Sequence, residues 1–238
     1  MPVSNIKLLR KEGVAEETMA FHFEKPAGFE YRAGQFGDFT LINPPETDAE
    51  GNTRGFSLAS APDDRDLMIA TRMRDTAFKR VLKNLPLGAA VKLDAPYGDF
   101  TLHKTQTTPA VYLTGGIGIT PVRSIIAAAT RQKLPHKITL LYANRTAQSA
   151  AFTSDLLTFA DRNPNFTFVS VVAEGKAPGG KAETGLINRA MLQKYVPDMQ
   201  APIYYLSGPA AMVAAMRKIL TEAKVNEDNI RTEEFSGY

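Results

Sequence analysis

The stretch Gly115-Gly116-Ile117-Gly118-Ile119-Thr120-Pro121 stands between a strand-like apolar run, residues 110–114, and a helix-like run, residues 121–131. Glycines at such a turn let backbone N–H groups and the helix N-terminus face a phosphate with no side chain in the way. Pro121 suits the first helical turn, where its missing N–H costs nothing. The spacing differs from the six-residue Gly-x-Gly-x-x-Gly fingerprint, so a tight turn that only packs closely explains the glycines equally well.

The chain on both sides of this turn alternates apolar strand-like runs with amphipathic helix-like runs. Further strands are expected at residues 138–143, 166–173 and 203–207, and further helices at residues 153–162, 186–195 and 210–224. Such alternation is typical of a doubly wound sheet of parallel strands. We therefore predict an α/β domain over residues 108–238.

Two other strand ends in this half carry residues that suit a ligand. Ser207-Gly208-Pro209 ends one strand and precedes a helix, while Asn144 and Arg145 follow the strand at 138–143. Because ligands of doubly wound sheets bind at the carboxyl ends of strands, the two glycine turns could form one cleft. Ser207 could equally be a helix cap. Arg145 could hold a nucleotide phosphate or be a solvated surface charge.

The first half of the chain follows a different pattern. Short apolar runs at residues 36–42, 67–73 and 90–94 alternate with turn residues, which indicates β-strands. One amphipathic helix is expected at residues 76–84. Its start at Thr76 offers a phosphate site or only an N-cap. Closely spaced strands with one helix predict a small antiparallel barrel over residues 1–103, followed by a polar linker that ends in proline.

A second informative segment is Arg54-Gly55-Phe56-Ser57-Leu58-Ala59-Ser60, within this barrel. Arg54 can hold a phosphate through two parallel hydrogen bonds. Phe56 can lie flat against a planar ring, and Ser57 can hydrogen-bond a ring heteroatom. The same letters also fit a plain strand in which Phe56 and Leu58 point inward. The segment taken alone leaves both interpretations open.

The composition of the 238-residue chain excludes several classes of function. It contains no cysteine, which excludes disulfides, a thiolate nucleophile and a cysteine-bound iron–sulfur cluster. Its three histidines are far apart in sequence, so we predict no metal site. The net charge of +3 comes with no basic stripe of interleaved aromatics, so no nucleic-acid partner is expected. Neither a signal peptide nor a membrane span is recognisable, and we expect a cytoplasmic protein.

Taken in order, these segments resemble the ferredoxin–NADP reductase superfamily over residues 34–238. The matching motifs are Ala33-Gly34-Gln35-Phe36, residues 54–60 for the flavin signature Arg-x-Tyr-Ser/Thr-x-x-Ser, Ala95-Pro96-Tyr97-Gly98-Asp99-Phe100, residues 114–121 for the nicotinamide nucleotide, and Ser207-Gly208-Pro209 for Cys-Gly-Pro. The resemblance implies two domains, a flavin-binding antiparallel barrel with one helix and an NAD(P)-binding doubly wound parallel sheet.

The resemblance also implies the residues that bind each cofactor. Those implied for tightly but non-covalently bound FAD are Arg54, Phe56, Ser57 and Leu58, with Ala70, Thr71 and Arg72 on the adenine side and Thr76, Ala77 and Phe78 in the second phosphate loop. Those implied for NADPH or NADH are Thr114, Gly115, Gly116, Ile117, Gly118 and Pro121, joined by Asn144, Arg145, Ser207, Gly208 and Pro209. Arg145 alone slightly favours NADPH, and the choice stays open.

The chain departs from the superfamily pattern at several positions. Phe56 replaces the usual tyrosine and loses a hydroxyl, Asp75 to Phe78 replace a glycine-led phosphate loop, and Ser207 replaces a cysteine. The cysteine is dispensable for hydride transfer because the flavin does the redox chemistry. FAD is favoured over FMN because the barrel offers a second phosphate site at a helix start and the chain ends in aromatics.

The tail, residues 233–238, resembles the superfamily's C-terminus, where a glutamate precedes an aromatic ring that stacks on the flavin. Glu233 and Phe235 fit this pattern, and Tyr238 is a second candidate ring. Ser57, Glu233 and Phe235 are therefore the expected residues at the reacting atoms.

The implied activity of the chain is FAD-dependent oxidation of NAD(P)H. Electrons would pass on to ferredoxin, flavodoxin, an oxygenase component or a small molecule. The alternative is a non-autonomous electron-input or regulatory subunit on the same scaffold. The oligomeric state is not predicted.

Overall fold

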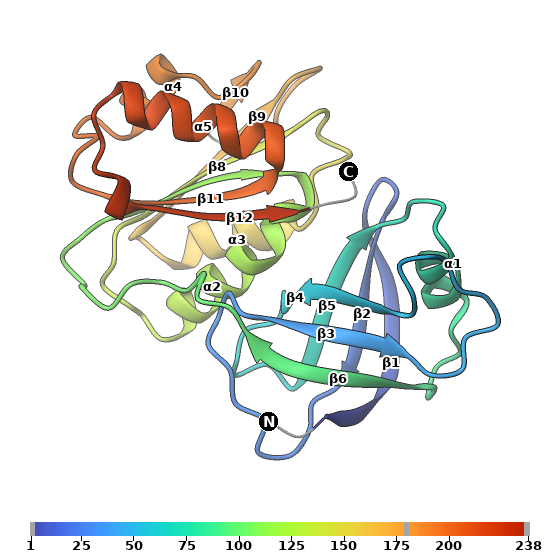
Figure 1. Ribbon diagram of the computed structural model, residues 1–238. Coiled ribbons are helices and arrows are strands. Elements are labelled where there is room, and N and C mark those ends of the chain that lie inside the picture. Colours follow the sequence, from blue (N-terminus) through green and yellow to red (C-terminus); the bar gives the residue numbers. More distant parts are fainter. Residues whose placement is uncertain (1–2, 179–180, 236–238) are drawn as a thin grey trace.

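The computed structural model describes residues 3–178 and 181–235, and its two halves form two separate six-stranded sheets (Figure 1). The first half is an antiparallel barrel with strand order β4-β3-β6-β1-β2-β5 and one helix, α1. Its elements are β1 (Ser4–Ala15), β2 (Thr18–Glu24), β3 (Phe36–Leu41), β4 (Thr53–Ser57), β5 (Asp66–Arg72), α1 (Ala77–Asn84) and β6 (Ala90–Tyr97). The predicted barrel with one helix is confirmed.

The barrel strands form because their apolar residues alternate with polar ones. In β3, for example, residues Gly37, Phe39 and Leu41 are buried and the residues between them are only partly buried. The inward side chains of all the strands and of α1 make one core. Helix α1 begins after Thr76, whose hydroxyl accepts a hydrogen bond from the Lys79 N–H at 3.4 Å. This cap fixes the helix start at one end of the barrel.

The second half is a six-stranded sheet in which every neighbouring pair is parallel, in the order β10-β9-β8-β7-β11-β12. Its elements are β7 (Ala110–Gly115), the short helix η1 (Gly116–Gly118), α2 (Ile119–Arg131), β8 (Ile138–Asn144), α3 (Thr153–Arg162), β9 (Phe166–Val172), β10 (Ala182–Thr184), α4 (Arg189–Tyr195), β11 (Ile203–Pro209), α5 (Ala210–Glu222), η2 (Glu227–Asn229) and β12 (Ile230–Phe235). Helices α2 and α3 cover one face and α4 and α5 the other (Figure 1). This is the predicted doubly wound sheet.

One predicted helix is shorter than its pattern indicated. Residues 186–195 were expected to be helical, but α4 begins only at Arg189. The side chain of Asn188 accepts a hydrogen bond from the Met191 N–H at 3.0 Å and caps the helix there. An asparagine at this position stops the helix from extending backward.

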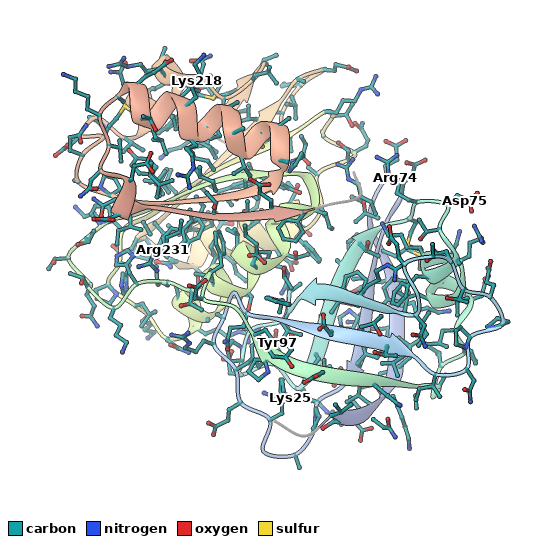
Figure 2. All side chains as sticks on the ribbon, in the orientation of Figure 1. Lys25, Arg74, Asp75, Tyr97, Lys218 and Arg231 are labelled. Atoms are coloured by element: carbon teal, nitrogen blue, oxygen red, sulfur yellow. The ribbon has the colours of Figure 1, made fainter. Side chains whose placement is uncertain are left out.

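The two halves are joined by packing and by hydrogen bonds. Barrel residues such as Ala59 and Phe100 share a core cluster with the apolar face of α2. Arg123 on α2 donates to the Ala59 carbonyl at 2.7 Å, and Arg231 on β12 donates to the Thr101 carbonyl at 3.0 Å (Figure 2). The first bond holds the end of the segment 54–60 against α2, and the second holds residue Thr101, after β6, against β12. The domain boundary near residues 103–108 stays a prediction.

Among the described residues, no helix is both long enough and apolar enough to span a bilayer.

Candidate functional site

The order of the parallel strands creates a crevice beside β7. From β7 the chain moves outward through β8 and β9, and then returns to place β11 on the opposite side of β7. Ligands of such sheets bind outside the carboxyl ends of the strands where the direction reverses. Strand β7 ends at Gly115 and β11 ends at Pro209. Both predicted glycine turns therefore meet at the crevice.

The two turns touch each other directly, which explains their glycines. A Cβ added to Gly118 would lie 2.6 Å from the Ser207 carbonyl group and 2.7 Å from the Gly208 nitrogen. Gly208 has a φ of +148°, and a Cβ there would lie 3.0 Å from the Gly115 oxygen. These glycines are therefore needed for the close packing of the two turns. Whether they also face a phosphate, as the sequence allowed, stays a prediction.

We predict that Gly118→Ala destabilises the fold by about 2 kcal/mol, because a methyl group would push against backbone atoms that cannot rotate away. Urea unfolding of the purified chain measures the loss. Gly13→Ala is the matched control, since no atom lies within 4 Å of a Cβ at that strand position. If the two variants unfold at the same urea concentration, the contact between the turns is not tight.

Ser207 lies inside this contact and does not cap a helix. Its hydroxyl is fully buried and hydrogen-bonds the Thr114 hydroxyl at 3.1 Å. Helix α5 instead has Pro209 at its N-cap position, with no side-chain cap bond. The helix-cap interpretation of Ser207 is therefore wrong. Its hydrogen bond with Thr114 instead links the neighbouring strands β11 and β7.

A pocket of about 290 Å³ lies between the barrel and the turn that follows β7. Nine predicted residues line it: Arg54, Phe56, Ser57, Ala70, Thr71, Arg72, Thr76, Ile117 and Phe235. Five residues that the sequence did not single out as ligands complete the lining: Glu50, Gly55, Arg74, Lys79 and Thr120. Segments from both halves of the chain, far apart in the sequence, thus share one site.

The lining of this pocket is strongly basic. Four cations, Arg54, Arg72, Arg74 and Lys79, face a single carboxylate, Glu50. Figure 2 shows Arg74 at the end of the barrel nearest the second sheet. Lys79 is half-buried, and burial, followed by the neighbouring Arg74 and Arg54 charges, lowers its pKa. Such a cluster favours an anionic ligand, since an anion would relieve the repulsion among the cations.

Several acceptors hold the guanidinium of Arg54. It pairs with Asp48 at 2.9 Å and with Glu50 at 3.1 Å, and it donates to the Gly51 carbonyl at 2.9 Å. Its guanidinium also lies over the Phe78 ring, 5.2 Å from the ring centre. Glu50 is well exposed, so a ligand phosphate can take its place on the guanidinium.

The aromatic residues of the barrel divide between the pocket and the core. Phe56 lines the pocket and rests on Phe39 and Phe78, with ring centres 5.9 and 5.8 Å away. The side chains of Leu58, Ala77 and Phe78 are buried in the barrel and its neighbouring segments. The resemblance implied that these three residues bind FAD. Because their side chains are buried, they could do so only through their backbone groups.

Ser57 and Glu233 connect the barrel to the last strand of the sheet. The Ser57 hydroxyl donates to Glu233 Oε1 at 3.5 Å, and the second oxygen, Oε2, is buried without a protein partner. Burial raises the pKa of Glu233 to about 7, opposed by the Ser57 hydrogen bond and assisted by the nearby Asp99 charge. A carboxyl group that titrates near neutrality beside a pocket can hold or release a proton during a reaction.

The end of β12 brings the predicted tail to the same place. In the parallel pairing of β11 with β12, Glu233 lies opposite Ser207 and Phe235 opposite Pro209. Phe235 consequently lines the barrel pocket from the second half of the chain. Tyr238, the other predicted ring, lies outside the described residues.

Comparison with known proteins finds a family match in the second half of the chain and similar reductases over most of its length. Residues 112–218 match the family described as "Oxidoreductase NAD-binding domain". The chain is 27% identical over 220 residues to the reductase component of propane 2-monooxygenase of Rhodococcus jostii, covering 89% of this chain and 57% of that protein. It is 28% identical over 211 residues to the ferredoxin–NAD(P)(+) reductase component of the naphthalene 1,2-dioxygenase system of Pseudomonas putida, covering 87% and 61%.

A solved structure shows the same two-part fold. It is a ferredoxin NADP+ reductase from Neisseria gonorrhoeae with bound FAD and NADP, which superposes with a TM-score of 0.78 at 19% identity and 98% coverage of both chains. Residues 112–218 therefore carry an oxidoreductase NAD-binding domain, and the chain shares the two-domain fold of this reductase. It spans less than two thirds of the length of the curated relatives named above.

The remaining predicted residues lie along the carboxyl edge of the parallel sheet. Thr114 and the glycines at 115–118 end β7, Pro121 lies in the first turn of α2, and Gly208 and Pro209 end β11. Asn144 ends β8 with a buried Oδ1 that has no protein partner. Arg145 follows it, is exposed, and pairs with Glu174 at 3.0 Å. None of these residues lines the barrel pocket.

Proposed function

We propose that this chain is a flavin-dependent NAD(P)H oxidoreductase that binds FAD in the barrel pocket and the nicotinamide nucleotide along the carboxyl edge of the parallel sheet. One observation carries the proposal. The basic pocket is lined by aromatic rings from both halves, Phe56 and Phe235, and lies beside the glycine turn after β7. A diphosphate attached to a planar ring fits both the charge and the shape of such a site.

The residues present fit FAD in particular. Arg54, Arg74 and Lys79 offer three cations to a pyrophosphate, and the start of α1 after Thr76 adds backbone N–H groups that face an anion favourably. Phe56 and Phe235 would contact the ring system. The strand segment Ala70, Thr71 and Arg72, which lines the same pocket, would contact the adenine side.

The flavin supplies the redox chemistry when bound, since it accepts a hydride and releases electrons one or two at a time. The protein's residues orient the two cofactors and exclude water. The turn at 115–118 and the segment 207–209 would hold the nicotinamide nucleotide against the pocket. The Ser57 hydroxyl would pass a proton to or from Glu233 Oε1, and the pKa of about 7 allows Glu233 to take either role at neutral pH.

Electrons would leave to a protein such as ferredoxin, flavodoxin or an oxygenase component, or to a small molecule. The propane 2-monooxygenase relative is itself a reductase component, which supports a protein acceptor. A cytoplasmic location is likewise proposed.

The test is spectroscopic and kinetic. We expect the purified chain to be yellow, to release FAD on denaturation, and to oxidise NADH or NADPH when ferricyanide is the acceptor. A chain that neither retains nor rebinds FAD would overturn the proposal. A chain that binds FAD and nucleotide but does not turn over would favour the non-autonomous electron-input or regulatory subunit.

A further inference from the structure

The order of the strands fixes the direction in which a dinucleotide would cross the sheet. Phe235, at the end of the outermost strand β12, lines the pocket proposed for the flavin, and a nicotinamide that meets its ring there points from β7 toward β11 and β12. With the pyrophosphate on the turn after β7, the adenosine half then extends the other way, over the ends of β8 and β9. Neighbouring strands lie about 4.8 Å apart, so these ends are within about 10 Å of the turn.

Two oppositely charged side chains stand at those ends. Arg145 follows β8 and Glu174 follows β9. The Glu174 N–H donates to the Arg145 carbonyl at 2.8 Å, and the Ala173 N–H donates to the Asn144 carbonyl at 3.0 Å. The backbone ladder therefore continues past the strands and holds the two residues side by side. Arg145 Nε donates to Glu174 Oε1 at 3.0 Å.

This ion pair makes Arg145 less suited to bind a phosphate. An arginine alone at this position suits the 2′-phosphate that distinguishes NADPH from NADH, and the sequence slightly favoured NADPH for that reason. Glu174 places a carboxylate on the same guanidinium. A phosphate monoester carries a charge of about −1.5 to −2 at neutral pH, and it would meet that carboxylate at close range. The neutral hydroxyls of an unmodified ribose would instead donate to it.

We infer that Glu174 makes this chain select NADH over NADPH, an inference that rests on the proposed function. The Glu174 carboxylate would repel the 2′-phosphate of NADPH, and such a repulsive contact is a common way to discriminate between two closely similar ligands. Arg145 orients Glu174, and a 2′-phosphate could reach this guanidinium only by displacing the carboxylate or by lying against it.

The experiment is calorimetric titration of the FAD-loaded chain with NAD+ and with NADP+. We expect the wild-type chain to bind NADP+ at least about tenfold more weakly than NAD+. Glu174→Gln should strengthen NADP+ binding about tenfold while changing NAD+ binding less than about threefold. Adding Arg145→Gln to that variant should abolish the gain, because the freed guanidinium is what would hold the phosphate.

The matched control is Glu227→Gln, which breaks an ion pair of the same kind at the opposite edge of the sheet, just before β12. Glu227 accepts from Arg217 at 3.1 Å, and its loss should leave both affinities unchanged. Equal or tighter binding of NADP+ by the wild-type chain would overturn the inference, and so would a Glu174→Gln variant with an unchanged ratio. Binding of neither nucleotide would instead overturn the proposed function.

Discussion

Replacing Arg54 with alanine is expected to weaken FAD binding about 100-fold. A 100-fold loss corresponds to about 2.7 kcal/mol, which is the contribution of one strong hydrogen bond between charged groups, about 1.5–3 kcal/mol. The guanidinium is held in one orientation by Asp48 and by the Gly51 carbonyl, so it is prepared for a phosphate before one arrives. Equilibrium titration of the flavin-stripped chain with FAD measures the change.

Two further variants separate a direct role of Arg54 from a structural one. Arg80→Ala removes a nearby arginine whose partners are Glu46 and Asp75 and which does not line the pocket, so FAD binding should hold within about threefold. Asp48→Asn removes the negative charge that holds Arg54 but keeps the guanidinium. If Asp48→Asn weakens FAD binding as much as Arg54→Ala does, then Arg54 only orders the loop and the pyrophosphate lies elsewhere.

The parallel half of the fold could be predicted from sequence because its central strands are buried on both faces. All six residues of β7 are buried, so its sequence reads as an unbroken apolar run between polar segments. Strands β1 and β12 were not predicted. In β1 only Ile6 and Leu8 are buried, and in β12 only Ile230 is, because much of each strand faces solvent. Charged strands of this kind leave no periodic apolar signal.

The site could be predicted only in part for a similar reason. Arg54, Ser57 and Phe235 belong to motifs that the sequence displays, and the structure brings all three to one pocket. Arg74 and Lys79 belong to none. Their presence in the pocket depends on how the chain turns from β5 into α1, and the only sequence signal was a set of cations on both sides of the cap at Thr76. The Glu174 partner of Arg145 depends on the register of β8 with β9.

Replacing Glu233 with glutamine is expected to stabilise the chain at pH 8 by about 3 kcal/mol and to change stability little at pH 5. The folded-state pKa of about 7 lies above the ordinary value of 4.5, because the carboxyl group is buried. Between these values the native chain binds more protons than the unfolded chain, so stability falls as the pH rises. The wild-type chain loses this contribution above pH 7, whereas neutral glutamine keeps it. Urea unfolding at both pH values measures the difference.

The neighbouring variant Glu234→Gln is the control, since that side chain is exposed and its replacement should leave stability unchanged at either pH. A gain of equal size at pH 5 and pH 8 would show that glutamine merely packs better and that the charge of Glu233 is not the cause. Turnover adds an independent reading. If Glu233 exchanges a proton through the Ser57 hydroxyl, the glutamine variant becomes more stable and yet slower, and its rate loses the inflection near pH 7. A buried, half-paired carboxylate costs the fold stability, and its presence beside the pocket therefore supports the proton-transfer role proposed for Glu233.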